Sequence, residues 1–222
     1  MYRHLHEELE KLKTTSLKMA SEVKDSLKNC IVAFQKMDTD LAQEVIDRDN
    51  LINSLEVEID KICLRLLALE GPVASDLRFI LGCMRASIDL ERIGDEAANI
   101  AEATIVLSLK PALPFYIELG RMGEKALEML EYALDSFFKP DPEIAIDVCK
   151  MDSKVDLLND KIIKEIIAYM IKETPAIERS VYCINIARRF ERIGDLATNI
   201  AESSVFIAKG INIKHYCQFD NR

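Results

Sequence analysis

Apolar residues recur at spacings of three and four along almost the whole chain, which is the pattern of amphipathic helices. Only seven glycines and six prolines occur in 222 residues, and most of them lie between the periodic segments. No segment shows convincing strand character. The pattern predicts an all-α protein with six long helices at residues 5–36, 40–70, 73–108, 114–138, 142–172 and 175–209.

The breaks between these segments contain residues that begin or end helices. We expect Asp38 or its neighbour Thr39 to cap the second helix, and Asp141, followed by a proline, to cap the fifth. Pro72 is expected in the first turn of the third helix. Gly210 stands where a C-terminal cap belongs. These residues support the six predicted helices.

The two halves of the chain resemble each other. A shift of 103 residues aligns Asp49 with Asp152, and a shift of 100 aligns Cys83 with Cys183. One short deletion before the last helix explains the change of register. The sequence therefore predicts two tandem three-helix bundles related by pseudo-symmetry, which we call repeat one (residues 1–110) and repeat two (residues 111–222).

Composition narrows the class of protein. The net charge of −9 disfavours nucleic acid as a partner, because an acidic surface repels phosphate backbones. The N-terminal residues have no apolar signal-peptide core, and no run of 18 apolar residues predicts a membrane span. Scattered cysteines without a CxxC pair favour reduced core thiols in a cytoplasmic protein: Cys30, Cys63, Cys83, Cys149, Cys183 and Cys217.

One phrase occurs twice. Residues 91–102 read "ERIGDEAANIAE" and residues 191–202 read "ERIGDLATNIAE", with ten of twelve positions identical. At about 100° per residue, Glu91 and Asp95 share one side of a helix and the apolar residues take the other side. A polar stripe of this kind ordinarily faces water. Because the same acids recur in both halves, a ligand-binding role is the alternative interpretation.

The helix before each phrase carries a matching polar pair. Asp152 and Asp156 are four residues apart and share one face, and their counterparts are Asp49 and Asn53. If these faces meet, the oxygens suit a hard cation such as Mg, Ca, Mn or Fe. A salt-bridge network around Arg188 stays open as an alternative in repeat two. The candidate metal ligands are Asp49, Asn53, Glu91, Asp95, Asp152, Asp156, Glu191 and Asp195.

The residues that most catalytic sites need do not stand out in the sequence. The three histidines, His4, His6 and His215, lie near the chain ends, so the Glu-x-x-His pairs of di-iron bundles are missing. No Gly-rich phosphate loop or Gly-x-Ser-x-Gly elbow occurs. We therefore expect no enzyme, with a carboxylate-bridged metalloenzyme as the alternative.

The sequence resembles the PhoU family, the bacterial regulators of phosphate uptake, over nearly its whole length. The resemblance includes "LALEGPVASDLRFI" at 67–80 and "DLERIGDEAANIAE" at 89–102 in repeat one. In repeat two it includes "MDSKVDLLNDKI" at 151–162 and "FERIGDLATNIAE" at 190–202. Two tandem copies of ERIGD, each after its own Asp-bearing helix, make this resemblance specific.

The resemblance implies a cytoplasmic accessory protein, without catalytic activity, that restrains phosphate uptake and phosphate-starvation signalling. Its implied partners are the phosphate ABC transporter and a membrane sensor histidine kinase. The family also binds metal through E/D-xxx-D motifs, in some members as multinuclear iron clusters. Iron is therefore the first expectation here, with zinc, manganese or magnesium as alternatives. The sequence leaves open whether the chain forms a homodimer.

Carried onto this chain, the motif pairs are Glu91 with Asp95, Glu191 with Asp195, and Asp152 with Asp156. Asp49 also matches, whereas Asn53 stands where the family has an acid. Repeat two thus has four carboxylates among these positions and repeat one has three. Charge count predicts that repeat two binds metal more tightly.

Overall fold

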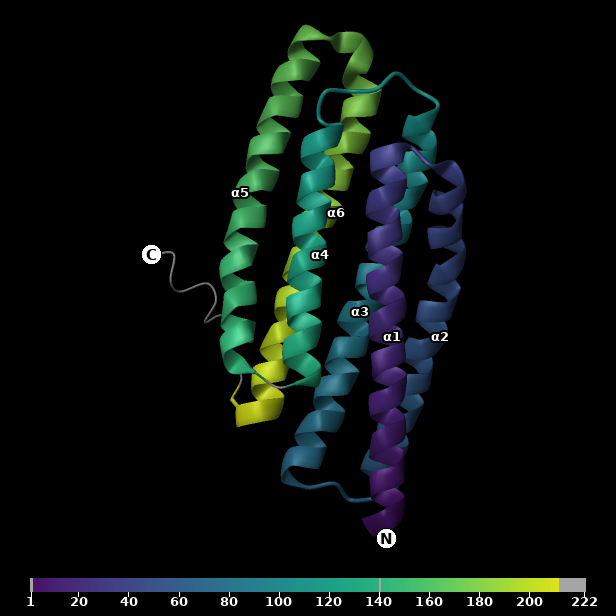
Figure 1. The fold of residues 1–222 in the computed structure, drawn as a ribbon, viewed down its shortest axis with the longest axis vertical. Coiled ribbons are helices and arrows are strands. Elements are labelled where there is room, and N and C mark those ends of the chain that lie inside the picture. The colour runs from purple at the N-terminus through teal and green to yellow at the C-terminus, as the bar shows by residue number, and fades with distance from the viewer. Residues whose placement is uncertain (1, 140, 212–222) are drawn as a thin grey trace.

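The computed structural model describes residues 2–139 and 141–211 of the chain (Figure 1). It contains six α-helices and one short 3-10 helix in the described residues, and no strand among them. The all-α prediction is therefore confirmed. The elements are α1 (Tyr2–Lys36), α2 (Thr39–Leu69), α3 (Ala74–Ser108), α4 (Tyr116–Phe138), α5 (Pro142–Lys172), η1 (Thr174–Ala176) and α6 (Ile177–Lys209).

Most of the predicted helix ends are confirmed. The Asp38 carboxylate accepts a hydrogen bond from the backbone N–H of Leu41 at 3.0 Å, so Asp38 is the cap of α2. The Asp141 carboxylate caps α5 in the same way, and Gly210 ends α6 with a left-handed φ of 68°. The prediction for Pro72 is wrong, because α3 begins only at Ala74. Positive φ values at Gly71 and at Ala74, the first residue of α3, turn the chain there, so Pro72 lies in the turn that precedes the helix.

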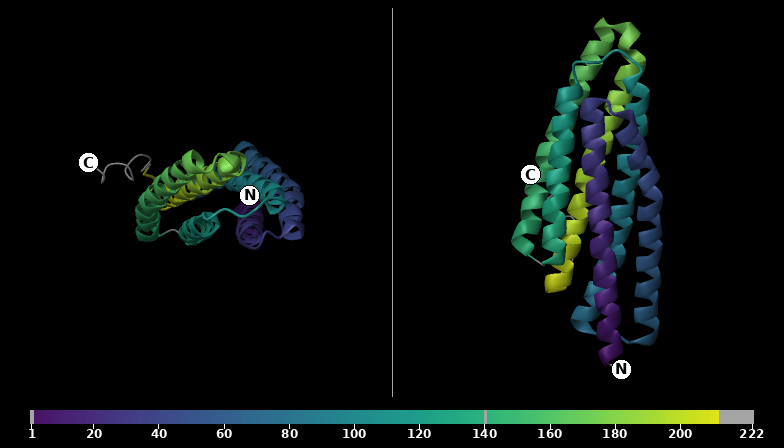
Figure 2. Two further views of the ribbon diagram at one scale, coloured as in Figure 1. Left: turned by 90° about the horizontal axis from the view of Figure 1, so that it is seen from above. Right: turned by 45° about the vertical axis from the view of Figure 1, so that its right-hand side comes forward.

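The six helices run alternately up and down along the long axis of the molecule (Figure 1). Helices α1, α2 and α3 pack against one another, and so do α4, α5 and α6. Seen from above, the two groups lie side by side, and residues 109–115 connect them (Figure 2). The prediction of two tandem three-helix bundles is confirmed, and the exact domain limits stay a prediction.

The two repeats share one continuous hydrophobic core. α3 packs against α6 and α1 packs against α4 across the junction. The rings of Phe34 and Tyr116 lie 5.4 Å apart between their centroids. A Cβ added at Gly123 would lie 2.7 Å from the Phe190 ring, so only glycine allows α4 to approach α6 this closely. The long axes of the bundles are thereby fixed relative to each other.

The cysteine prediction is confirmed for four residues and contradicted for one. Cys30, Cys63, Cys83 and Cys183 are buried free thiols. Cys149 is disulfide-bonded instead of reduced. The prediction failed there because apolar neighbours along the chain do not report which sulfur atoms meet in space. Cys217 and His215 lie outside the described residues. Because Cys149 is disulfide-bonded, the cysteine pattern alone does not indicate a reducing compartment.

Candidate metal centres on α2–α3 and α5–α6

The glycine of ERIGD contacts an aspartate of the preceding helix in both repeats. A Cβ placed on Gly94 of α3 would lie 3.4 Å from Oδ1 of Asp49 on α2. A Cβ placed on Gly194 of α6 would lie 3.4 Å from Oδ1 of Asp152 on α5. The aspartate side chain therefore lies against the helix that carries the ExxxD motif. This is the juxtaposition of faces that the sequence predicted.

Repeat one combines carboxylates with one amide. Asn53 Nδ2 donates a hydrogen bond to Asp49 Oδ2 at 3.1 Å. Burial raises the pKa of Asp49, the Asp95 charge raises it further, and the Asn53 hydrogen bond lowers it. Burial also raises the pKa of Glu91, followed by the charges of Asp95, Glu56 and Asp49. These couplings show that the carboxylates of α2 and α3 lie near one another.

Repeat two brings together carboxylates alone at the matching positions. Burial raises the pKa of Asp152 to about 7, and the charges of Asp156, Asp195 and Glu191 add to the rise. Burial, then Asp195 and Asp156, raises the pKa of Glu191. The pKa of Asp195 is raised by burial and by Asp156. All four predicted residues of repeat two therefore belong to one electrostatic cluster.

Arg188 does not neutralise this cluster. Its side chain is exposed, and its charge lowers the pKa of Glu191 less than burial, Asp195 and Asp156 raise it. Among the described residues, Arg188 forms no ion pair within 4 Å. The salt-bridge network that the sequence left open is therefore not formed around Arg188.

The buried oxygens of both clusters fit a cation. Asp49 Oδ1, Asn53 Oδ1 and Asp152 Oδ1 are inaccessible to solvent and accept no hydrogen bond from the protein. A buried acceptor without a partner costs about 1–3 kcal/mol, which a hard cation would offset. Carboxylate and amide oxygens are the donors that such ions prefer. The donor chemistry therefore fits a metal in both repeats.

The carboxylate side chains of each cluster do not converge closely enough to surround one metal ion. In residues 2–139 and 141–211, no three His, Cys, Asp or Glu side chains form a ready-made metal site. The electrostatic couplings nevertheless place the carboxylates in one neighbourhood, and like charges favour rotamers that hold them apart. Asp95, Asp156 and Asp195 are exposed enough to turn inward. Because exposed side chains change rotamer easily, these three carboxylates can turn towards the unpartnered oxygens of Asp49 and Asp152.

The sequence did not reveal two further acids, one coupled to the repeat-one cluster and one at the junction between the repeats. Glu56, seven residues after Asp49, contributes to the raised pKa of Glu91. Glu96, directly after the first ERIGD, is buried between the repeats and accepts ion pairs from Arg189 at 2.6 Å and Arg192 at 3.0 Å. The seven-residue spacing could have revealed Glu56. Nothing in the local pattern reveals Glu96, because its partners come from the other repeat.

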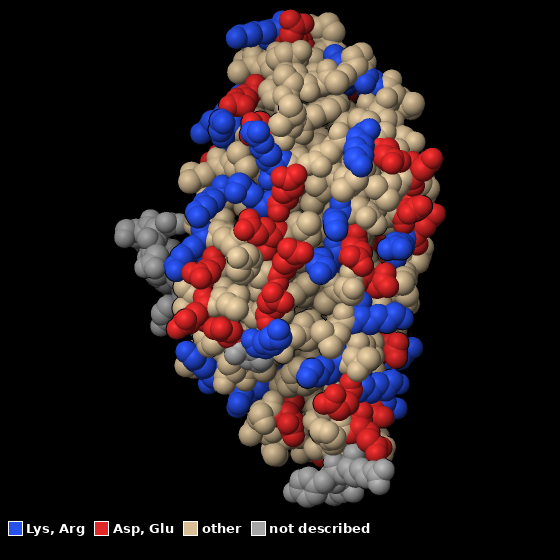
Figure 3. All heavy atoms as spheres, viewed as in Figure 1, with Lys and Arg blue, Asp and Glu red and all other residues tan. Residues whose placement is uncertain are grey.

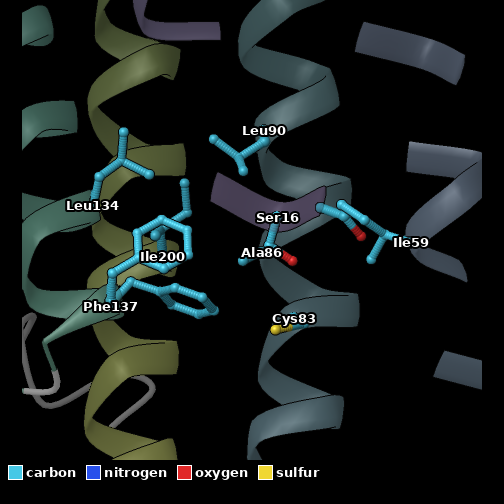
Figure 4. A pocket seen from close by; sticks show the side chains of 10 residues that line it. Ser16, Ile59, Cys83, Ala86, Leu90, Leu134, Phe137 and Ile200 are labelled. Atoms are coloured by element: carbon cyan, nitrogen blue, oxygen red, sulfur yellow. The ribbon is translucent and has the colours of Figure 1, made fainter. Parts of the chain in front are cut away.

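A small cavity lies between the repeats, and none of the candidate metal ligands lines it (Figure 4). Its volume of about 10 Å³ holds no more than one water molecule. Burial raises the pKa of Cys83, which lines it, to about 12, so this thiol stays protonated. Its other lining residues are mostly apolar and include Ala86, Leu90, Leu134, Phe137 and Ile200. The cavity therefore has neither the room nor the reactive groups of a substrate site.

The face shown in Figure 3 carries interspersed acidic and basic side chains. No broad basic field of the kind that binds nucleic acid covers this face. Among the described residues, no helix combines the length and apolar character needed to cross a bilayer.

Comparisons with known proteins agree with this architecture. The family model "PhoU domain" matches the chain twice, at residues 17–104 and 119–204. The "phosphate-specific transport system accessory protein PhoU homolog" of Aquifex aeolicus is 38% identical over 95% of this chain and 96% of the relative. The Escherichia coli protein of that name, PhoU, is 33% identical over 94% of this chain and 86% of the relative.

Two crystal structures share the fold. PhoU from Pseudomonas aeruginosa superposes with a TM-score of 0.90 at 37% identity, covering 93% of this chain and 99% of that one. The phosphate transport system regulatory protein PhoU from Streptococcus pneumoniae gives a TM-score of 0.85 at 31% identity, covering 94% and 98%. The duplicated three-helix repeat, the paired ExxxD helices and these matches together show that the chain belongs to the PhoU family.

Proposed function

We propose that this chain is an accessory regulator of a phosphate transport system that restrains phosphate uptake and phosphate-starvation signalling. The observation that carries the proposal is its end-to-end similarity to proteins named as phosphate-specific transport system accessory proteins. Both family-model matches fall on the described helices, so the similarity covers the complete duplicated architecture. The chain would act by binding other proteins rather than by catalysis.

The partners that we propose are a phosphate ABC transporter and a membrane sensor histidine kinase, which the chain would link as a cytoplasmic adaptor. Two long bundles with a continuous core form a rigid body that can present two separate surfaces. A homodimer is a further assembly that this proposal allows.

The proposal includes metal at both acidic clusters. In repeat one, Asp49, Asn53, Glu91 and Asp95 would hold it, and in repeat two Asp152, Asp156, Glu191 and Asp195 would do so. The unpartnered inner oxygens of Asp49 and Asp152 support this assignment. Oxygen donors suit iron, manganese and magnesium better than they suit zinc, and iron is our first expectation. The ion would neutralise the carboxylates and tie α2 to α3 and α5 to α6.

Deletion of the gene tests the regulatory role. We expect phosphate uptake and phosphate-starvation genes to become active in phosphate-rich medium, because the restraint is removed. Complementation with wild type should restore repression. Normal repression in the deletion strain would contradict the proposal.

Complementation with site variants tests whether metal takes part. The double variant Asp152→Asn/Glu191→Gln should fail to restore full repression, whereas the control Asp147→Asn should restore it. Asp147 lies on the same helix and is exposed, with Lys150 as its neighbour at 2.8 Å. Full repression by the double variant would show that the repeat-two metal is dispensable for regulation. Assays of the purified protein for oxygen consumption and phosphoester cleavage should find neither, and turnover in either would favour the metalloenzyme alternative.

A further inference from the structure

A groove lies between α1 and α4, on the face shown in Figure 3. Near the C-terminal end of α1 the two helices touch, because a Cβ placed on Gly120 of α4 would lie 2.9 Å from the Gln35 side chain of α1. Nearer the C-terminal end of α4 they leave a hollow of about 510 Å³ between them. Binding clefts commonly measure about 300–1,000 Å³, so this hollow is large enough to receive part of a partner.

Apolar side chains from both helices line the groove. Ala20 of α1 and Leu134 of α4 are buried, and Leu17 of α1 and Phe138 of α4 are more exposed. The exposed fraction of Leu17 is 43%. A single exposed leucine is ordinary, but this one borders a hollow that apolar side chains of the opposite helix line as well. A partner that filled the hollow would remove this apolar surface from water, which favours association.

The two walls of the groove carry opposite net charge. Glu131 and Asp135 line the α4 wall, and Figure 3 shows acidic side chains in a column over α4. Glu128 continues this row one turn earlier and is exposed. Lys139 is the one basic residue among those that line the α4 wall, whereas Lys24 is the charged residue that lines the α1 wall. The α4 wall is therefore acidic and the α1 wall basic.

These charges are available to a partner. Within the part of the chain that the structure describes, Lys24, Glu131 and Asp135 form no ion pair within 4 Å. In the neighbouring groove between α4 and α5, by contrast, each wall carries one acidic and one basic residue. Of these two grooves, the one between α1 and α4 is therefore the one whose walls differ in charge.

The charges also indicate which partner fits. The acidic row on α4 repels the phosphates of anionic lipids and nucleic acids. A second copy of this chain is disfavoured as well, because its net charge of −9 would bring more acidic groups to the row. Lys24 lies seven residues after Leu17, so the groove extends over about two helical turns, or about 10 Å. A short amphipathic helix of another protein matches this length and an apolar lining.

We propose that the α1–α4 groove receives an amphipathic helix of a partner protein, with basic residues along its α4 side and acidic residues along its α1 side. Its apolar stripe would pack against Leu17, Leu134 and Phe138. This inference rests on the proposed role in binding other proteins, and it assigns a surface to that role. None of the candidate metal ligands lines the groove.

Binding to purified partners tests the apolar part of the groove. The probes are the ATP-binding subunit of the phosphate transporter and the cytoplasmic part of the sensor kinase, each measured against the full chain by biolayer interferometry. Leu17→Glu should weaken binding about tenfold or more, because the burial of one leucine side chain is lost. The matched control Leu64→Glu changes a 58% exposed leucine of α2 and should leave the affinity unchanged. Circular dichroism of each variant verifies that the helices are intact.

Reversal of the two walls tests the charge pattern. Lys24→Glu/Glu131→Lys keeps the net charge and exchanges the signs across the groove, so association should become about threefold slower or more. The control Glu44→Lys/Lys61→Glu exchanges two exposed charges of α2 in the same way and should leave the association rate unchanged.

Three results would overturn this inference. If a probe that binds wild type binds Leu17→Glu and the charge-reversed variant equally well, the groove is not the docking surface and the proposed function stays in place. If sedimentation shows a wild-type dimer that Leu17→Glu dissociates, the groove belongs to a second copy of the chain. If wild type binds neither probe, the proposed adaptor role is itself overturned, and this inference with it.

Discussion

The two repeats use the same ExxxD phrase in different electrostatic surroundings. In repeat one, the Asn53 amide donates a hydrogen bond to Asp49 and lowers its pKa. In repeat two, Asp156 stands in that place, and its charge helps to raise the pKa of Asp152 to about 7. One substitution between amide and acid therefore converts a neighbour that stabilises the charged carboxylate into one that destabilises it. The repeats share one backbone arrangement and differ in what surrounds the aspartate that faces ERIGD: an amide beside Asp49 and a carboxylate beside Asp152.

The junction between the repeats shows a second asymmetry. Glu96 follows the first ERIGD and is buried between Arg189 and Arg192 of α6. The residue after the second ERIGD is Leu196, which is buried in the core. The residue that directly follows ERIGD thus forms an ion pair in repeat one and an apolar contact in repeat two. The symmetry-related ion pair is therefore absent, because Leu196 stands where a second acid would have to lie.

The largest effect that we expect concerns this junction. Glu96→Gln should lower the free energy of unfolding by about 2–4 kcal/mol, because it leaves Arg189 half-buried beside a neutral group. The control Glu102→Gln removes an exposed acid of the same helix and should change stability by less than about 0.5 kcal/mol. Urea denaturation followed by circular dichroism measures both. Equal effects of the two variants would show that the junction does not depend on the ion pair.

The next effect concerns Asp156 in the acidic cluster of repeat two. Asp156→Asn gives repeat two the amide that repeat one has at Asn53, so repeat two loses one carboxylate. We expect about tenfold weaker binding of Mn²⁺ and Fe²⁺ at that repeat. The control Asp147→Asn, which changes an exposed acid of the same helix, should leave the affinity unchanged. Titration of wild type and both variants decides the matter, and unchanged affinity in Asp156→Asn would remove residue 156 from the ligand set.

A smaller effect should appear in the pH dependence of stability without added metal. Between pH about 4 and 7, Asp152 is protonated in the folded protein and ionised in the unfolded chain. The folded state then binds more protons, so the free energy of unfolding falls as the pH rises towards 7. Asp152→Asn should flatten this slope, whereas Asp49→Asn should change it less. Denaturation in the presence of a chelator at several pH values measures the slopes, and a rise of stability over this range would contradict the prediction.

The smallest effect distinguishes the two ERIGD glycines. Alanine is favoured over glycine inside a helix by about 0.5–1 kcal/mol. A Cβ at Gly194 would meet Met129 and Asp152 at 3.4 Å, an ordinary contact, so Gly194→Ala should stabilise the protein by that amount. A Cβ at Gly94 would come within 3.0 Å of Ile52, so Gly94→Ala should gain nothing or destabilise. Equal changes in the midpoint of urea unfolding would show that the two helix pairs are packed equally tightly.

Much of the fold could be predicted from local pattern. Helix periodicity placed six helices with ends correct to within about three residues, because an amphipathic helix repeats its apolar face at every turn. Two caps followed from Asp38 and Asp141, whose side chains bond to the N–H groups just after them. Pro72 was misplaced because the turn at Gly71 and Ala74 extends past it. Local chemistry predicted these features wherever the interacting groups are neighbours in sequence.

The acidic clusters were predicted in part. Spacing within a helix put Glu91 with Asp95 and Asp152 with Asp156 on shared faces, and the duplicated phrase indicated that these faces matter. Pattern alone could not show that Glu56 lies near Glu91 or that the inner oxygen of Asp152 lacks a partner. Those facts depend on how two helices are rotated against each other. Helix packing selects that rotation through many side chains distributed along both helices.

The sequence by itself determined the helices, the duplication and the stripes of oxygen donors, because each depends on residues within a few turns of one another. Only the tertiary structure decided that the two cores merge, that Glu96 reaches across to Arg189, and that the inner oxygen of Asp152 is buried without a partner. These contacts join residues far apart along the chain. Their formation follows from the packing of whole helices, and the burial that packing produces sets the charge balance of each repeat.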